Sequence, residues 1–178
     1  LIKAYRWMVS KSAMLSCPAL VGLGVLAPEA IPVAFGEKWE TSGVLVQIMC
    51  LMVVPYALAG FTSPVLMALG RAATLRTFAL SQVISTAVFA LAAAPFGLVA
   101  VAWASVGRAY LALPIQLWML RSASGLRPQD ALGAVARPLL ASLLMGAAVW
   151  PLMDLLQPHF SSDVVPLAIC VAAGVVIY

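Results

Sequence analysis

Residues 98–120 read LVAVAWASVGRAYLALPIQLWML, an apolar segment that contains one charged side chain, Arg108. At about 1.5 Å of rise per helical residue, this segment is long enough to cross about 30 Å of hydrocarbon. Similar apolar stretches occur before and after it. Together they cover residues 13–35, 44–70, 74–94, 98–120, 138–156 and 164–178. The pattern predicts an all-α, multi-pass transmembrane helix bundle with about six spans, the last of which stops short.

The composition points to the same class of protein. Hydrophobic residues make up 64% of the 178 residues and charged residues only 9%. A soluble protein needs more polar surface around its core, so we reject a greasy soluble domain. The cysteines lie within apolar stretches, where we expect small buried side chains rather than disulfides. Because Leu1 is not an initiator methionine and the last residues are still apolar, we interpret the chain as a fragment.

Basic side chains gather in alternate gaps between the apolar stretches. Cytoplasmic loops carry an excess of lysine and arginine, so these gaps are expected to face the cytoplasm. The opposite gaps contain acidic side chains and the only histidine, His159. The net charge of +4 thus marks one membrane face, and no nucleic-acid partner is needed to explain it. The residues of the basic gaps are Lys3, Arg6, Lys11, Arg71, Arg76, Arg121, Arg127 and Arg137.

The longest apolar stretch, residues 44–70, contains Pro55 and Pro64. Each proline removes a backbone donor and clashes with the preceding turn, so we predict a bent helix in which Thr62 or Ser63 bonds a freed carbonyl. The bend is either a packing feature or the hinge of a transport cavity.

The turns between stretches predict how the chain is organised. Short turns at 70–76 and 95–97 predict adjacent antiparallel helices. Residues 125–137 are predicted to be a cytoplasmic loop. That loop would separate a four-span part, residues 1–124, from a last helix pair, residues 138–178, that is truncated at its C-terminus.

Arg108 is the basic residue that no loop explains. It lies near the middle of its apolar stretch, where facing lipid would cost at least a few kcal/mol, so it must face protein or water. It either bonds backbone carbonyls or an acid elsewhere in the protein, or it acts as a cation in a substrate cavity. Gln82, Gln47 and Gln116 are candidates for the same cavity, or simply interhelical hydrogen-bond partners.

The helical spacing of 98–120 also assigns the two faces of this span. Ala104, Ser105 and Ala112 share the face of Arg108. A bulkier stripe on the opposite face is expected to contact lipid. Its residues are Val99, Trp103, Val106, Leu113 and Leu117.

No signature of an enzyme is visible. His159 has no cysteine nearby, so it cannot build a metal site or a nucleophile and base pair alone. The acidic residues fall mostly in the outer gaps, where solvation explains them. A glycine-rich phosphate loop is missing, so the sequence predicts no ATP site. We therefore predict a protein that is not an enzyme, without catalytic residues, metal or cofactor.

Two motifs resemble a known family. The segment LAPEAIPVAFGEKW, residues 26–39, and the segment TSPVLMALGR, residues 62–71, are similar to the second half of bacterial polysaccharide flippases. These are the Wzx-type or lipopolysaccharide biosynthesis proteins of the MOP transporter superfamily. The resemblance covers about residues 5–151 and implies the second lobe of a MOP/MATE-like transporter. Arg108 belongs to neither motif.

The resemblance implies a multi-pass transport protein of the bacterial inner membrane. Its expected activity is to move lipid-linked oligosaccharide, linked through undecaprenyl diphosphate, from the cytoplasmic to the periplasmic leaflet for polysaccharide, O-antigen or exopolysaccharide biosynthesis. The expected partners are this lipid-linked oligosaccharide and membrane lipids, with a polysaccharide polymerase and glycosyltransferases as further candidates. The alternatives are a cation-coupled drug or metabolite exporter of the same superfamily, an integral-membrane sugar or acyl transferase, and a purely structural subunit.

Overall fold

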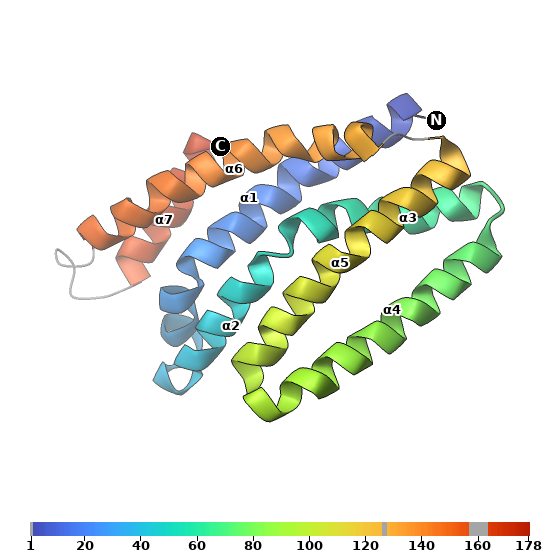
Figure 1. Ribbon diagram of the computed structural model, residues 1–178. Coiled ribbons are helices and arrows are strands. Elements are labelled where there is room, and N and C mark those ends of the chain that lie inside the picture. Colours follow the sequence, from blue (N-terminus) through green and yellow to red (C-terminus); the bar gives the residue numbers. More distant parts are fainter. Residues whose placement is uncertain (1, 126–127, 157–163) are drawn as a thin grey trace.

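The computed structural model describes residues 2–125, 128–156 and 164–178, and within them the chain forms α-helices and short 3₁₀ turns but no strand (Figure 1). The prediction of an all-α fold is confirmed. In chain order the elements are α1 (Ile2–Phe35), η1 (Glu37–Trp39), α2 (Glu40–Cys50), α3 (Val53–Ala68), α4 (Ala72–Ala93), η2 (Ala94–Phe96), α5 (Leu98–Ser124), α6 (Pro128–Leu156) and α7 (Val164–Ile177).

The helices long and apolar enough to cross a membrane are α1, α4, α5 and α6 among the described residues. Helices α2 and α3 add a fifth span if they are counted as one broken helix. Helix α7 has 14 residues, about 21 Å, which is shorter than the hydrocarbon core. The expectation of about six spans is thus reduced to four or five in the described part of the chain.

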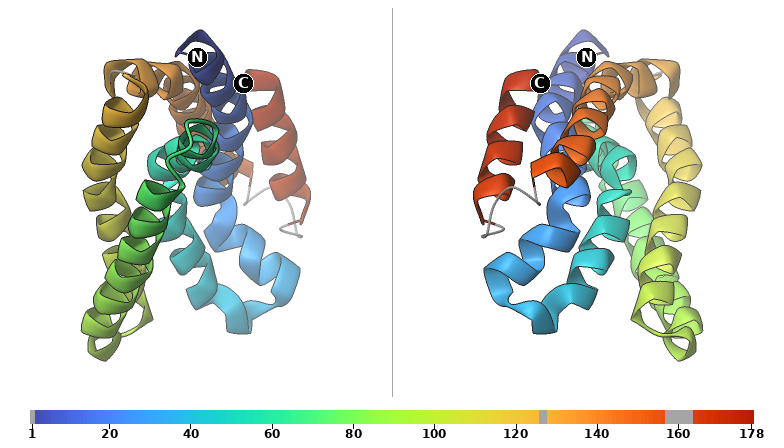
Figure 2. Two further views of the ribbon diagram at one scale, coloured as in Figure 1. Left: turned by 90° about the vertical axis from the view of Figure 1, so that its right-hand side faces the viewer. Right: turned by 90° about the vertical axis from the view of Figure 1, so that its left-hand side faces the viewer.

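Apart from the break between α2 and α3, the turns between helices that the structure describes lie at two opposite ends of the bundle. The start of α1, the α3–α4 turn and the end of α5 lie at one end (Figures 1 and 2). The α1–α2 and α4–α5 turns lie at the other end. The basic residues Arg6, Arg71, Arg76 and Arg121 therefore share one end, as the sequence pattern predicted. We call it the basic end.

The bent helix predicted over residues 44–70 is confirmed, and the break lies between Cys50 and Val53 with an angle of 58°. Pro55 explains this position, because it has no N–H to bond the carbonyl of Leu51 one turn earlier. Pro64 does not break the chain and lies inside α3. The Thr62 hydroxyl donates to the carbonyl of Leu58, not to the carbonyl at 60 that Pro64 frees.

Helix α1 lies at the centre of the packing, against α2, α3, α6 and α7. One of its faces is fully buried at Val9, Ala13 and Cys17, and packs against α3, α5 and α6. All three cysteines are buried and unpaired by disulfides, as predicted. Close approach to neighbouring helices relies on glycine: a Cβ added at Gly43 of α2 would lie 2.9 Å from the carbonyl oxygen of Ala27.

The predicted loop 125–137 is mostly helix. Helix α6 begins at Pro128, because proline suits the first turn of a helix and Asp130 in that turn favours the positive end of the helix dipole. Before it, α5 ends at Gly125, whose left-handed φ of 72° lets its N–H bond the carbonyl of Arg121 at 2.9 Å. The apolar pattern underestimated α6, because Gln129, Asp130 and Arg137 interrupt the apolar residues of its first turns.

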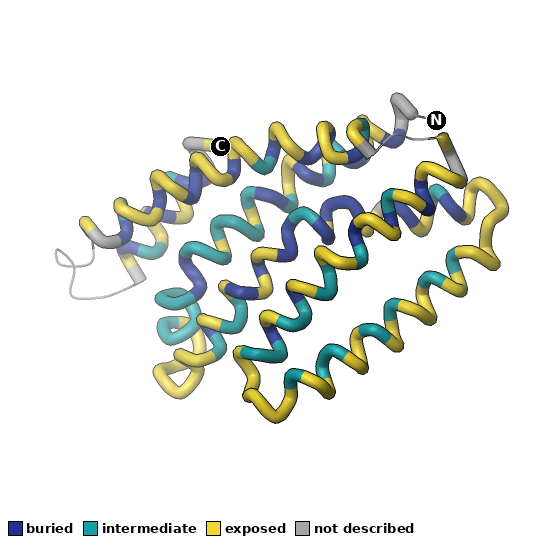
Figure 3. Tube along the Cα trace, viewed as in Figure 1, coloured by how far each residue is buried: buried dark blue, intermediate teal, exposed yellow. Residues whose placement is uncertain are grey.

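Large apolar side chains cover much of the outer surface. Helix α4 has no buried residue among those described, and its exposed residues run along most of its length (Figure 3). In water such continuous apolar surface would favour aggregation, whereas lipid tails solvate it. The exposed side chains of α4, α5 and α6 include Leu80, Val83, Ile84, Val88, Leu91, Leu111, Ile115, Trp118, Leu140, Leu143 and Leu144.

Candidate functional site

Arg108 lies close to the middle of a membrane-spanning helix. The apolar part of α5 covers Leu98–Ser122, so Arg108 is two residues, about 3 Å, from its midpoint. The side chain is half-buried, and its Nη1 donates a hydrogen bond to Oε1 of Gln82 on α4. The Nε atom is buried and has no hydrogen-bond partner in the described part of the chain. The guanidinium thus keeps an unused donor next to an uncharged partner.

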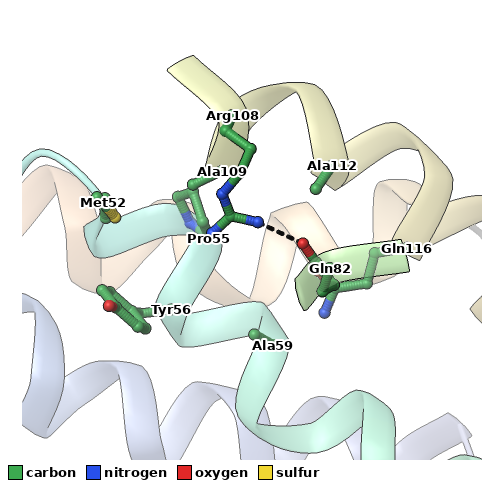
Figure 4. Close-up of a pocket in the computed structure, with 9 residues that line it drawn as sticks. All are labelled: Met52, Pro55, Tyr56, Ala59, Gln82, Arg108, Ala109, Ala112 and Gln116. Carbon is green, nitrogen blue, oxygen red and sulfur yellow. Dashed lines mark hydrogen bonds between the residues drawn. The ribbon is translucent and has the colours of Figure 1, made fainter. Parts of the chain in front are cut away.

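The Arg108 guanidinium borders a small cavity, which we call the Arg108 pocket. Its volume is about 100 Å³, and it lies between α3, α4 and α5. Figure 4 shows the guanidinium reaching from α5 to Gln82, beside Pro55 of α3. None of the lining residues carries a negative charge, so the cation has no counter-ion there. They are Met52, Pro55, Tyr56, Ala59, Gln82, Arg108, Ala109, Ala112 and Gln116.

A second polar pair joins α5 to α3, and one of its members, Gln116, lines the same pocket as Arg108. The side chain of Gln116 is 5% exposed, and its Nε2 donates to Oγ1 of Thr62 at 2.6 Å. Thr62 in turn donates to the carbonyl of Leu58 at 3.3 Å. Sequence reasoning assigned Thr62 only to the backbone, and the pairing with Gln116 was missed. The two residues are 54 positions apart, and a contact between two helices leaves no regular spacing in the sequence.

A third polar contact lies at the break before α3. The hydroxyl of Tyr110 on α5 donates to the carbonyl of Leu51 at 2.9 Å. This is the carbonyl that Pro55 deprives of its helical donor, and a backbone group that faces hydrocarbon needs such a replacement. Sequence reasoning did not single out Tyr110. The feature that could have identified Tyr110 is its hydroxyl group, which lies in an apolar span two residues after Arg108.

The structure brings together most of the predicted cavity residues but not all of them. Gln82 and Gln116 line the Arg108 pocket, and so does Pro55 at the break. Gln47 does not: it is exposed on α2, because its neighbour Ile48 occupies the face that packs on α5. Pro64 is exposed on α3 and does not line the pocket either.

The predicted lipid-facing stripe of α5 is partly wrong. Val99 and Trp103 are exposed, but Val106 and Leu113 are buried, and Leu117 packs on the central core. The reason is that α5 contacts α2, α3, α4 and α6, which leaves only a narrow outer face. That face carries Leu111, Ile115 and Trp118. The prediction for the other face of α5 holds at Ala112, which lines the pocket together with Arg108.

Some residues considered from the sequence lie outside the described part of the chain. These are Arg127, His159 and Asp163. The structure adds one ion pair that the sequence analysis did not consider. Arg6 of α1 lies 3.5 Å from Asp130 of α6, at the basic end.

Comparison with known proteins gives one informative relative. The chain is 27% identical over 173 residues to the teichuronic acid biosynthesis protein TuaB of Bacillus subtilis (strain 168). The match covers 96% of this chain and 36% of that protein, so the chain spans about a third of its relative's length. No protein-family profile matches the chain. No solved structure matches it either.

Proposed function

We propose that this chain is part of a flippase that moves lipid-linked oligosaccharide across the membrane during bacterial polysaccharide biosynthesis. Its helices and its similarity to a teichuronic acid biosynthesis protein are compatible with a membrane protein of that process. The direction, from the cytoplasmic to the periplasmic leaflet, is the one that the family resemblance implies. The FGEKW and ALGR motifs resemble such flippases. Transport, rather than enzymatic chemistry, is the activity that we assign.

The observation that carries this proposal is Arg108, a cation near the centre of a span without an acidic partner in its pocket. A charge at that depth costs at least about 2.5 kcal/mol, so a fixed cation there favours a nearby anion, which we propose arrives with the substrate. A guanidinium binds two phosphate oxygens at once through its planar donor fork. A diphosphate-linked lipid supplies such a group. The Nε donor of Arg108, which is buried, has no hydrogen-bond partner among the described residues.

The neighbouring residues suit the rest of such a substrate. Gln82 and Gln116 present amides that bond sugar hydroxyls as donors and acceptors. The break at residues 51–52 adjoins the same pocket through Met52 and Pro55. We therefore propose Pro55, rather than Pro64, as the hinge about which α2 and α3 change their angle during transport.

The test uses the full-length protein in its native host. Arg108→Ala should reduce polysaccharide export at least about tenfold at equal protein abundance, while lipid-linked oligosaccharide accumulates in the cytoplasmic leaflet. Arg108→Lys keeps the charge but not the donor fork, so its export should be intermediate. Arg76→Ala, which removes an exposed arginine at the basic end, is the matched control and should export normally.

Two results would overturn the proposal. If Arg108→Ala lowers abundance and export equally, Arg108 has a structural role. If depletion of the full-length protein strands no lipid-linked oligosaccharide on the cytoplasmic side, the protein is not the flippase. Accumulation of a drug or metabolite instead would identify an exporter of the same superfamily.

A further inference from the structure

A second hollow lies at the basic end, far along the bundle from the Arg108 pocket. Its volume is about 590 Å³, and it lies between α1 and α6, which run side by side (Figure 1). Arg6, Trp7 and Ser10 line it from α1, and Gly133 and Arg137 line it from α6. We call it the α1–α6 groove. The proposed flippase activity does not use it.

The groove owes its space to a missing side chain. Gly133 and Arg137 are one helical turn apart on α6, and Arg6 and Ser10 are one turn apart on α1, so the four line one face of each helix. A Cβ added at Gly133 would meet no atom within 4 Å. The space between the two arginines is therefore open and is not filled by the protein's own side chains.

The charges of the groove are only partly neutralised. Arg6 has a single ion-pair contact, 3.5 Å from Asp130, and its side chain remains 55% exposed. Arg137 makes no ion pair within the described part of the chain and is exposed. Two guanidinium groups thus line the groove, and one carboxylate, that of Asp130, pairs with one of them. The surplus positive charge favours an anionic ligand.

The level of the groove in the membrane identifies the kind of anion. Helices α1 and α6 are about 50 Å and about 43 Å long, so their ends extend beyond a 30 Å hydrocarbon core. Arg137 is the last charged residue of α6 before the apolar segment 138–153, and Lys11 is the last on α1 before 12–28. Trp7, which is 65% exposed, is typical of the headgroup region. The groove therefore opens among lipid headgroups.

We propose that the α1–α6 groove binds the headgroup of an anionic phospholipid, with Arg6 and Arg137 contacting its phosphate and Trp7 packing on its glycerol and upper acyl chain. Basic pockets between transmembrane helices are suited to such headgroups. Asp130 competes with the phosphate for Arg6 and so sets the affinity.

The test measures phosphatidylglycerol binding to the full-length protein by native mass spectrometry, in mixed micelles with phosphatidylcholine as competitor. The double variant Arg6→Gln/Arg137→Gln should weaken the tightest binding at least about tenfold. Its matched control, Arg71→Gln/Arg76→Gln, removes two exposed charges from the same end and should retain that binding. Asp130→Asn should tighten lipid binding, because it frees Arg6 to contact the phosphate. If the ion pair only held α1 against α6, its loss would not tighten lipid binding.

A second variant keeps the test informative if the double variant does not fold. Gly133→Leu fills the groove and leaves both arginines in place, so it should also abolish the tight binding. Gly107→Leu, at another open helical glycine, is its control. If the two double arginine variants lose lipid affinity equally, the proposal is overturned, because the lipid then responds to the overall charge of the basic end and not to the groove. Equal binding of phosphatidylcholine, or displacement by inorganic phosphate at the same concentration, would also overturn a specific anionic-lipid site.

Discussion

Helices α4 and α6 are equally apolar, yet they occupy opposite environments. Ser142, Met145 and Val149 of α6 are at most 4% exposed, whereas α4 has no buried residue among those described. Helix α6 packs along α1, with Gly146 so close that an added Cβ would lie 2.9 Å from Cγ1 of Val21. Helix α4 has no glycine and lies at an edge of the bundle, opposite α7 (Figure 2).

The difference shows what holds helices together in lipid. Apolar area drives no association there, because the surrounding tails are as apolar as leucine, so close packing and interhelical hydrogen bonds decide. The α1–α2–α6 region uses small residues such as Gly43 and Gly146. The α3–α4–α5 region uses polar pairs, Arg108 with Gln82 and Gln116 with Thr62. We call the α1–α2–α6 region the packed half of the bundle and the α3–α4–α5 region its polar half.

The largest change is expected from Gly43→Ala in the packed half. The new methyl group would lie 2.9 Å from the carbonyl oxygen of Ala27 and 3.1 Å from Cα of Pro28, both backbone atoms that cannot rotate away. Such overpacking should lower the free energy of unfolding by about 1–3 kcal/mol, measured by denaturation in mixed micelles. Gly107→Ala, at an open position, should be neutral or stabilising. If the two variants change the free energy of unfolding equally, close packing at Gly43 does not stabilise this half of the bundle.

A smaller change is expected from Gln82→Leu in the polar half. It removes the acceptor of the Arg108 hydrogen bond that joins α5 to α4. Interhelical hydrogen bonds in membranes contribute about 0.6 kcal/mol on average, so the loss should be modest. Spin labels on α4 and α5 should show a broader distance distribution. Ser85→Ala is the control, because that hydroxyl donates within its own helix to the carbonyl of Gln82. An unchanged distribution in Gln82→Leu would show that packing alone positions α4.

The smallest change is expected from Val88→Ala on α4. Val88 is 57% exposed, so its truncation should alter the free energy of unfolding by less than about 0.5 kcal/mol. The same substitution at Val149 of α6, which is 1% exposed, removes packed methyl groups and should cost clearly more. The comparison of α4 with α6 fails if the two substitutions have the same effect in the same micelles.

Much of the fold could be predicted because the hydrocarbon imposes length and composition directly. The apolar stretches at 74–94 and 98–120 match α4 and α5 closely, and α1 ends at Phe35 as expected before the Gly36 turn. Helix ends outside the apolar core were harder. Residues 128–137 carry Gln129, Asp130 and Arg137 and lie next to the Gly125 turn, so they were included in a loop, and only the proline and the acidic first turn indicate a helix start.

The candidate site was only partly visible in the sequence. Arg108 could be identified because a charge inside an apolar stretch is unusual, whatever its neighbours. Its partners could not be ranked, since Gln82, Gln116 and Gln47 are chemically alike and only the helix rotations separate them. The bond from Tyr110 to Leu51 depends on which helix lies beside the break. Such relations between distant residues leave no periodic signal along the chain.

The contact between α1 and α6 also has a consequence for how the protein is made. Helix α6 ends about 120 residues after α1, so at a translation rate of about 5–20 residues per second α1 waits roughly 6–24 s for its main neighbour. Until α3, α5 and α6 have been made, lipid covers Val9, Ala13 and Cys17. Their small apolar side chains suit it, and the Ser16 hydroxyl already bonds the carbonyl of Ser12 in its own helix. Residues 9, 13 and 17 therefore bring no polar group that needs a later partner, whereas Tyr5, one turn before Val9, carries a buried hydroxyl without a partner in the described part of the chain.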